Sequence, residues 1–293
     1  MHNHTHHSDQ SSHRIGWAFA LNVGFTIIEF VGGLLTNSTA IMADAVHDLG
    51  DSLSIGTAWV LSLLSKKEAD SSFTYGYKRL SLLGALINGI VLIAGSTWVL
   101  LQAIPRLFDP VMPEAEGMLA LAVLGVVVNG FAAYKLSQGT TLNEKVLNWH
   151  LLEDVLGWTA VLVVSIVLMI ADVPILDPLL AVGFTLFILF NVARNTWHAV
   201  KLFVQAVPER GLIERVRKEL SKIPEVASIH HEHAWSLDGE STVYTSHLVM
   251  SSPMSSEAQL DIKNQVAELL QRFEFSHTTI ELEFPQENCR DDE

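Results

Sequence analysis

The sequence predicts an α-helical membrane protein with a six-helix transmembrane domain and a small α+β domain after it. Of its 293 residues, 49% are hydrophobic and only 17% are charged, whereas about a quarter of the residues in a soluble domain are charged. Long apolar stretches fill the chain up to about residue 207. Beyond that point the apolar residues recur at the spacings of amphipathic helices and strands, as they do in a soluble domain.

Six apolar stretches are long enough to cross the hydrocarbon core of a bilayer, which takes about 20 residues in a helix. Residues that break helices or form turns separate them, including Pro105, Pro110 and Pro113. We expect the third and sixth helices to continue past the bilayer at their polar ends. The six expected spans are residues 15–35, 41–64, 80–101, 118–136, 147–170 and 179–200.

Basic residues lie almost entirely on one side of this six-span scheme, and Arg106 is the exception. Short cytoplasmic loops carry an excess of lysine and arginine, so both termini are expected in the cytoplasm. The first residues lack the basic start and apolar core of a signal peptide, and we expect the first span to insert the chain. The single cysteine, Cys289, excludes an internal disulfide. The basic residues on the cytoplasmic side are Arg14, Lys66, Lys67, Lys78, Arg79, Lys135, Lys145 and Lys201.

The region after Pro208 predicts a cytoplasmic two-layer domain with the element order αββαβ. It contains 17 acidic and 8 basic residues, so it carries a net charge of −9 out of the −14 of the chain. An acidic surface repels nucleic acid and suits cations, although a charged face that prevents aggregation is the alternative. The expected elements are helices over 211–223 and 256–273 and strands over 226–235, 242–250 and 278–284.

One four-residue spacing occurs in both the second and the fifth expected spans: His47 with Asp51, and His150 with Asp154. Residues four apart share a helix face, so each helix offers one imidazole and one carboxylate in one direction. Two such helices facing each other would present two nitrogens and two oxygens, a tetrahedral set that suits Zn²⁺ or a similar divalent ion. The alternative is that these four polar groups satisfy one another and hold the helices together.

Four other polar residues at membrane depth are candidates for an accessory pathway that guides metal or protons. Asp44 lies one turn before His47, Glu29 and Asn22 lie in the first span, and Asn129 lies in the fourth. Ionisable groups at this depth are expensive unless they are paired or hydrated, which favours a functional role. Helix packing or water binding is an equal alternative for each, and none is expected to be a metal ligand.

Several motifs of this sequence resemble those of the cation diffusion facilitator family, whose members export zinc and related divalent metals. The resemblance extends over about residues 16–285, and a single His-x-x-x-Asp pair would not support it. Two such pairs in spans two and five, six spans and the C-terminal pattern together make it specific. The matching motifs are residues 29–34, 38–47, 75–79, 150–154, 177–178 and 230–237.

The resemblance implies that His47, Asp51, His150 and Asp154 form the transport site. It implies Zn²⁺ as the first substrate and Cd²⁺ or Co²⁺ as the second, since imidazole suits zinc whereas harder oxygen ligands suit manganese. It further implies a homodimer in the bacterial inner membrane, a ferredoxin-like or metallochaperone-like C-terminal domain and no organic cofactor. The expected divisions are a His-rich tail at 1–13, the transmembrane domain at 14–207, the cytoplasmic domain at 208–285 and a tail at 286–293.

Charge balance predicts that protons are exchanged for metal at this site. Two carboxylates and two neutral imidazoles around a divalent cation sum to zero, and removal of the cation leaves two negative charges in a poorly solvated cavity. Burial and like-charge repulsion raise the proton affinity of such carboxylates, so protons and zinc compete for the same atoms. We therefore expect proton antiport by alternating access. A membrane metalloenzyme and a metal sensor that uses the same ligands are the alternatives.

A second metal site is expected in the cytoplasmic domain, where sheet pairing could bring several histidines together. The family uses comparable positions to bind zinc across a dimer interface. His231 is expected to face away from this site, because neighbouring residues of a regular strand point to opposite faces. Surface histidines without metal are the alternative. The candidate ligands are His230, His233, His247, His277 and Glu283.

Two further regions were candidates for metal binding. The N-terminal histidines at positions 2, 4, 6, 7 and 13 could collect metal loosely, and a merely polar tail is the alternative. The loop between the second and third spans holds a metal site in some relatives. Here it offers only Asp70, with Phe73, Tyr75 and Tyr77 where nitrogen ligands would be needed. We therefore expect no metal site in this loop.

Overall fold

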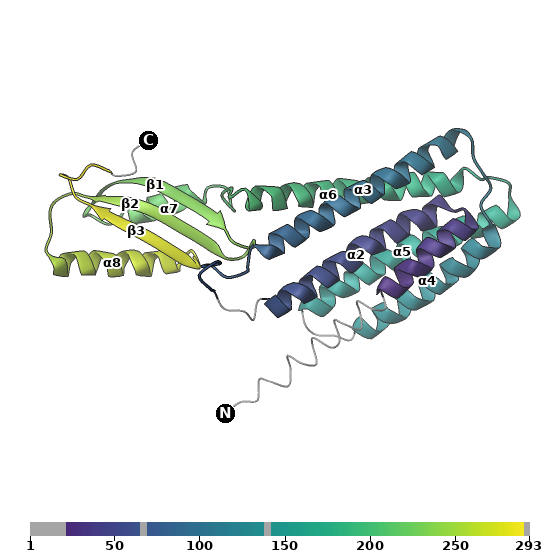
Figure 1. Ribbon diagram of the computed structural model, residues 1–293, viewed down its shortest axis with the longest axis horizontal. Helices are drawn as coiled ribbons and strands as arrows, with labels where there is room; N and C mark the ends of the chain where they lie inside the picture. Colours follow the sequence, from purple (N-terminus) through teal and green to yellow (C-terminus); the bar gives the residue numbers. More distant parts are fainter. Residues whose placement is uncertain (1–21, 65–68, 138–141, 290–293) are drawn as a thin grey trace, which may run out of the picture. The chain divides into compact units, whose positions relative to one another are not determined.

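The computed structural model describes residues 22–64, 69–137 and 142–289 (Figure 1). They form two compact units. One contains the described part of Met1–Ser62 together with Ile87–Thr196, and the other contains the described part of Leu63–Leu86 together with Trp197–Glu293. The border between the units therefore falls within apolar helices, before the residue 207 at which the sequence pattern changes.

The described residues of the first unit form helices and short turns, which confirms a helical transmembrane domain. Four of the described helices are long and apolar enough to cross a membrane: α3, α4, α6 and residues Leu151–Ile170 of α5. The described part of the helix before α2 is shorter, Asn22–Thr36, and α2 carries three aspartates along its length. The longer helices are α2 (Thr39–Leu64), α3 (Leu80–Phe108), α4 (Ala115–Leu136), α5 (Leu142–Ile170) and α6 (Leu176–Phe203).

Helix α3 continues through Pro105 to Phe108, although the sequence analysis treats Pro105 as a breaker. A proline removes one backbone donor and crowds the preceding turn. At Pro105 this loss falls in the last turn of the helix, and the amide of Asp109 still donates to the carbonyl of Pro105 at 3.1 Å. Helices α3 and α6 end at Phe108 and Phe203, beyond the apolar stretches 80–101 and 179–200 expected from the sequence.

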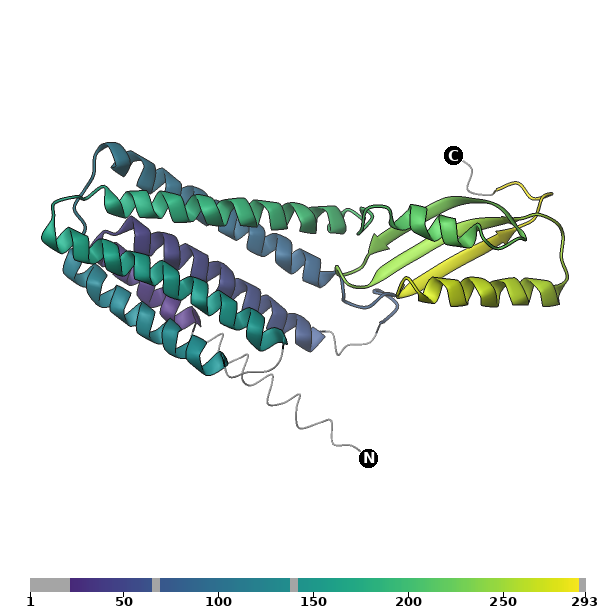
Figure 2. The same ribbon diagram turned by 180° about the vertical axis from the view of Figure 1, so that it is seen from behind.

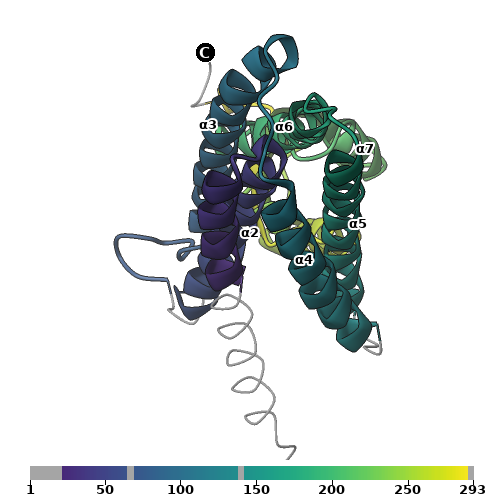
Figure 3. The same ribbon diagram turned by 90° about the vertical axis from the view of Figure 1, so that its right-hand side faces the viewer.

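The interior of the helical unit is built around Trp158 of α5, which is 1% exposed. Its ring meets Phe25 edge to face, with centroids 5.9 Å apart. Helices α4 and α5 pack along their length (Figure 3), and Gly125 of α4 makes room for the indole. Large apolar side chains such as Leu101 and Phe190 point outward and are exposed. Such an outer surface suits contact with lipid rather than water.

The second unit contains a small two-layer α/β domain with the predicted order αββαβ (Figure 2). Its sheet has the order β1-β2-β3, in which β1 and β2 are antiparallel and β2 and β3 are parallel. Because a parallel pair needs a crossover, α8 connects β2 to β3. The elements are α7 (Leu212–Leu220), β1 (Val226–Ser236), β2 (Thr242–Met250), α8 (Ser256–Gln271) and β3 (His277–Glu283).

Both helices of this domain cover the same face of the sheet. Leu212, Val216 and Leu220 recur every four residues on α7 and are buried, and α8 buries a matching stripe. These stripes form one apolar core with Tyr244, Leu248 and other residues of β2. Side chains alternate along a strand, so the intervening residues of β2 lie on the face without helices.

The segment before α3 belongs to the second unit. Lys78 donates a hydrogen bond to Ser241 Oγ at 3.0 Å, and the ring of Tyr75 meets His277 edge to face at 5.1 Å. The carboxylate of Asp70 accepts hydrogen bonds from the amides of Ser72 and Phe73, each at 2.8 Å. Asp70 thus shapes a turn in this segment.

Candidate metal centres

The first candidate centre begins with two side chains on one face of α2. His47 Nε2 and Asp51 Oδ2 lie 3.7 Å apart, with side chains 16% and 23% exposed. One helical turn separates the two residues, as their spacing predicts. The ring of His47 also meets Phe184 of α6 edge to face, with centroids 5.9 Å apart. The pair therefore points into the helical unit rather than toward lipid.

Helix α5 brings a third predicted residue to the same interior. Asp154 is 8% exposed and lies within electrostatic range of Asp44 and Glu29. A methyl group placed on Gly157, one turn after Asp154, would lie 3.7 Å from Asp44 Oδ1. These relations place α2 and α5 side by side at the level of the predicted ligands. His150 lies on α5 one turn before Asp154, but its side chain is outside the part that the structure describes.

The interior around these residues is strongly acidic. Glu29, Asp44 and Asp48 are 0%, 4% and 6% exposed, respectively. Asp48 is a buried carboxylate that the sequence analysis did not select. Buried carboxylates repel one another in a medium of low dielectric constant, so protons or cations must neutralise them. Such a site favours a divalent cation for its charge as well as for its ligands.

A cavity of about 400 Å³ opens beside this acidic interior, between α2, α5 and α6. Asp44 and Glu153 are its acidic lining residues, and the rest of the lining is formed by small and apolar residues such as Ala40 and Leu180. Asp44 is 4% exposed and therefore contributes little surface to this cavity. Its position beside the cavity fits both alternatives, an accessory pathway and the packing of helices.

The other two accessory candidates make different contacts. Asn22 Nδ2 donates to the carbonyl of Asp48 at 3.3 Å and to Ser52 Oγ at 3.0 Å, so it ties the first described helix to α2. Asn129 is 9% exposed, and its Nδ2 atom has no hydrogen-bond partner within the described residues. The contacts of Asn22 thus agree with a role in helix packing. The Nδ2 atom of Asn129 can still donate a hydrogen bond.

The second candidate centre lies on the sheet face that carries no helices. The register pairs His230 of β1 with His247 of β2, and Glu283 ends the neighbouring strand β3. His247 Nδ1 lies 2.7 Å from Glu283 Oε1, and His230 Nε2 lies 3.1 Å from Glu283 Oε2. Sheet pairing therefore brings three of the five predicted residues together.

Cys289 joins this group, although the sequence analysis did not include it. Its sulfur lies 3.6 Å from His247 Nδ1. One donor atom from each of His230, His247, Glu283 and Cys289 lies within 4.8 Å of the other three. The only signal in the sequence was a cysteine close after a strand that carries a candidate ligand, and spacing alone does not show that the chain turns back.

The carboxylate of Glu283 is held in its ionised form by this cluster. Burial alone raises the pKa of the group. Hydrogen bonds with Cys289 and His247 and the nearby His230 outweigh that effect, so the pKa lies below its ordinary value of 4.5. A metal ligand must be deprotonated to bind, and Glu283 meets this condition at neutral pH.

The remaining histidines of the sheet fall in different places. His277 pairs with Val243 at the opposite end of β3 from Glu283, so the strand length keeps it out of the cluster. His233 lies opposite Thr245, two positions along β2 from His247. His231 was expected to face away, and this is wrong. A bulge interrupts the register between His230 and His233, and His231 has a positive φ of 49°.

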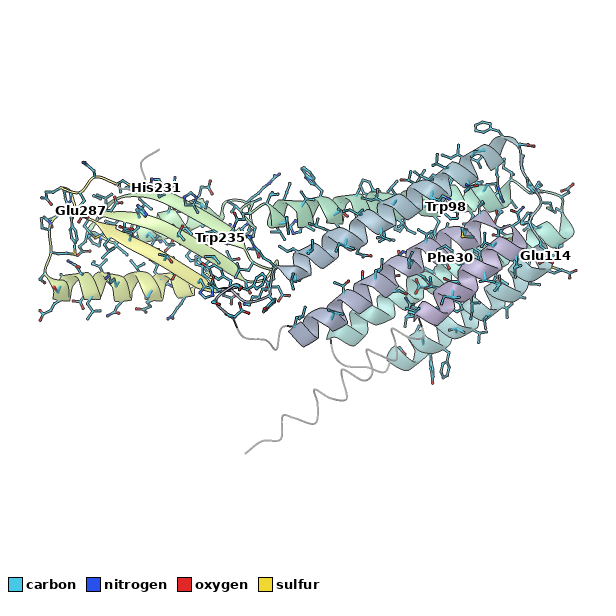
Figure 4. The ribbon with its side chains drawn as sticks, in the orientation of Figure 1. Phe30, Trp98, Glu114, His231, Trp235 and Glu287 are labelled. Atoms are coloured by element: carbon cyan, nitrogen blue, oxygen red, sulfur yellow. The ribbon has the colours of Figure 1, made fainter. Side chains whose placement is uncertain are left out.

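The bulge brings the ring of His231 close to two residues of the cluster, and Figure 4 labels His231 on the sheet. Its centroid lies 5.1 Å from that of His247 and 5.4 Å from that of His230. An extra residue in one strand changes the direction of the side chains that follow it, which is why strict alternation failed here.

Two family models match the chain. The model described as the cation efflux transmembrane domain matches residues 17–204. The model described as the cation efflux protein, cytoplasmic domain, matches residues 208–284. The two matches meet close to the point at which the sequence changes from apolar to soluble.

Several curated proteins are similar over nearly the whole chain. The zinc transporter ZitB of Pectobacterium atrosepticum is 30% identical over 99% of this chain and 91% of its own length. The cadmium, cobalt and zinc/H⁺-K⁺ antiporter of Bacillus subtilis is 28% identical over 97% of this chain and 93% of its own length. The cation efflux system protein CzcD of an Alcaligenes species is 30% identical over 96% of this chain and 89% of its own length.

Proposed function

The chain belongs to the cation diffusion facilitators, a family of cation efflux transporters, and on that premise we propose that it exports Zn²⁺ in exchange for protons. It is a transporter and not an enzyme. Zinc is the first substrate, and Cd²⁺ and Co²⁺ are the second. The names of the similar proteins support this range of metals.

The observation that carries the proposal is the pair on α2, with His47 Nε2 3.7 Å from Asp51 Oδ2. This pair faces an interior that also contains the buried Asp154 of α5. His150 completes the set by its spacing of four residues from Asp154. Two imidazoles and two carboxylates then bind one ion tetrahedrally between α2 and α5.

The exchange for protons follows from the charge of this interior. When zinc leaves, the carboxylates of Asp51 and Asp154 lose the cation that neutralises them. Their buried surroundings, which include Asp44 and Glu29, then favour the uptake of protons. Zinc loading releases the same protons, so an inward proton gradient drives zinc outward.

The cavity lined by Asp44 supports an aqueous route to the site. We assign Asp44 to this route, with Glu29 and Asn129 as further accessory groups. Asn22 acts mainly by packing, since its amide bonds to α2. Alternating access requires the helices that carry the ligands to expose the site to each side in turn.

Under this proposal, the protein has six spans, lies in the bacterial inner membrane and has both termini in the cytoplasm. The His-rich tail at 1–13 lies outside the described residues. The transport domain covers 14–207, the cytoplasmic domain 208–285 and a short tail 286–293. The name of the family model that matches the cytoplasmic domain refers to a dimer, which supports a homodimer in which His230, His247 and Glu283 bind regulatory zinc.

Zinc flux into vesicles that contain the purified protein tests this function. We expect flux to require a pH gradient, to be inhibited by Cd²⁺ and Co²⁺ more than by Mn²⁺, and to be lost in His47→Ala and Asp154→Asn. His198→Ala is the matched control, because His198 is an exposed histidine of α6. Flux that survives collapse of the pH gradient would refute the antiport. Wild-type flux in both ligand variants would refute the site.

A further inference from the structure

The cluster on the helix-free face of the sheet contains one donor that the proposed regulatory site does not use. His230, His247 and Glu283 come from three neighbouring strands and supply three ligands. A closed tetrahedral zinc site needs a fourth. Cys289, six residues after the end of β3, places its sulfur 3.6 Å from His247 Nδ1.

A turn directly after β3 brings this cysteine back over the sheet. The amide of Glu287 donates to the carbonyl of Phe284 at 2.9 Å. The amide of Phe284 in turn donates to Glu287 Oε2, also at 2.9 Å. These reciprocal bonds reverse the chain, and Figure 4 shows Glu287 at the end of the sheet away from Trp235. Cys289 therefore lies over the cluster because of a defined turn.

The spacing of the donor atoms suits a single small cation. In a tetrahedral zinc site with metal–nitrogen bonds near 2.0 Å and a metal–sulfur bond near 2.3 Å, neighbouring donors are about 3.3–3.7 Å apart. The observed contacts are 2.7 Å from His247 to Glu283, 3.1 Å from His230 to Glu283 and 3.6 Å from His247 to Cys289. The donor atoms of the other pairs lie within 4.8 Å of one another, so shifts of roughly 1–1.5 Å or less would bring all four to the distances of a tetrahedral site.

We propose that Cys289 supplies a thiolate to this site, so that one protomer alone provides a complete set of two nitrogens, one oxygen and one sulfur. The inference rests on the cytoplasmic zinc site proposed above and adds a ligand, a selectivity and a location to it. A thiolate favours Zn²⁺ and Cd²⁺ over Mn²⁺ and Mg²⁺. Metal binding also fixes the segment after β3 to the sheet.

The test is the ultraviolet absorption of the full-length protein in detergent during titration with Cd²⁺ or Co²⁺. A thiolate bound to either metal gives a charge-transfer band, and Cys289 is the single cysteine of the chain. Any such band therefore reports this residue alone. At saturation we expect the intensity of the band to correspond to one metal–thiolate bond per chain, independently of protein concentration.

Three variants locate the site. Cys289→Ser should abolish the band and weaken metal binding at this site by at least about tenfold, since loss of even an outer partner of a ligand costs 10–100-fold. His247→Ala should remove or strongly weaken the band. His277→Ala is the matched control, because His277 lies at the other end of β3, and it should leave the band unchanged.

The outcomes separate this inference from the transport proposal. Asp51→Asn should retain the band and lose flux, whereas Cys289→Ser should lose the band while the flux that remains still requires the pH gradient and Asp51. Absence of a band in the wild type while the histidine cluster still binds metal would overturn the role of Cys289 alone. A band that survives His247→Ala at full strength, or that grows with protein concentration, would place the thiolate elsewhere or between molecules and would also overturn it.

Discussion

Asp177, in the first turn of α6, accepts a hydrogen bond from Ser38 Oγ at 2.5 Å, directly before the start of α2. The same carboxylate accepts from the amide and the hydroxyl of Thr39, at 2.8 and 2.7 Å, and from the amide of Ala40 at 3.2 Å. It is 1% exposed. The N-terminal amides of α2, which have no partner within their own helix, are thus capped by a residue 138 positions away.

We expect Asp177→Asn to destabilise the protein and to slow transport. The substitution removes the charge and leaves an amide facing hydroxyl and N–H donors, and hydrogen bonds to charged groups contribute about 1.5–3 kcal/mol each. Because α2 carries His47 and Asp51, its loosened end should reduce zinc flux as well. Thermal unfolding in detergent and flux in vesicles measure the two effects. Asp172→Asn, at an exposed position of the loop before α6, should leave both unchanged.

Gly125→Ala should lower stability, whereas Gly130→Ala on the same helix should be tolerated. A methyl group on Gly125 would lie 2.2 Å from Cδ2 of Trp158, a rigid and buried ring. Overpacking of this kind costs about 1–3 kcal/mol. The nearest atom to a methyl group on Gly130 is Val155 Cγ2, at 4.0 Å. Equal unfolding temperatures for the two variants would contradict the packing of α4 against Trp158.

Asp44→Asn should separate passage through the cavity from binding at the site. Asp44 lines the cavity but is not assigned as a ligand, so its loss should lower the maximal flux several-fold and change the zinc concentration at half-maximal flux much less. Asp51→Asn should instead weaken zinc binding itself. Flux measured over a range of zinc concentrations distinguishes the two. Weaker binding in Asp44→Asn, with unchanged maximal flux, would make Asp44 a ligand.

The lowered pKa of Asp238 predicts that the protein loses stability at acidic pH. Burial alone raises the pKa of this carboxyl, but hydrogen bonds from Ser241 and Glu240 and the nearby charge of Lys78 outweigh it. The pKa therefore lies below its ordinary value of 3.8. Because the folded pKa is depressed, this stabilisation is complete above about pH 4 and is lost as the pH falls through the folded pKa.

The check is thermal unfolding of the full chain between neutral and acidic pH. We expect Asp238→Asn to unfold at a lower temperature than the wild type at pH 7, and the difference to shrink below about pH 4. Glu240→Gln, at an exposed neighbouring position, serves as the control. A difference between wild type and Asp238→Asn that persists undiminished into acid would rule out this role.

Periodic patterns in the sequence were sufficient for the elements of the small domain. Strand β2 begins at Thr242 and ends at Met250 as predicted, because its side chains alternate and a turn residue, Gly239, precedes it. The proximity of His47 and Asp51 on α2 followed from helix spacing in the same way. Both depend on contacts between near neighbours in the chain, which sequence spacing encodes directly.

Contacts between distant segments were not predictable in this way. The segment Asp177-Pro178 was noted as a motif, but nothing local indicates that its carboxylate caps a helix 138 residues earlier. The return of Cys289 depends on two bonds between Phe284 and Glu287. The bulge at His231 adds one residue to β1, and the strand contains no glycine or proline that would indicate it. Pro105 was expected to end the third helix, because a proline in a helix interior breaks it. In the last turn of α3 the same residue is tolerated.

The bulge also shifts the alternation of inward and outward side chains along β1 by one residue. Ile229 faces Leu248 before it and Ala234 faces Tyr244 after it, so two core residues lie an odd number of positions apart. Glu232 thereby turns inward, where its side chain is 3% exposed, bonded to Arg217 of α7 and 3.0 Å from the hydroxyl of Tyr244. Deletion of His231 would leave Glu232 alone opposite Ser246 and restore regular alternation, so the neighbouring residues would keep their present faces and only the imidazole that the bulge adds beside the cluster would be lost.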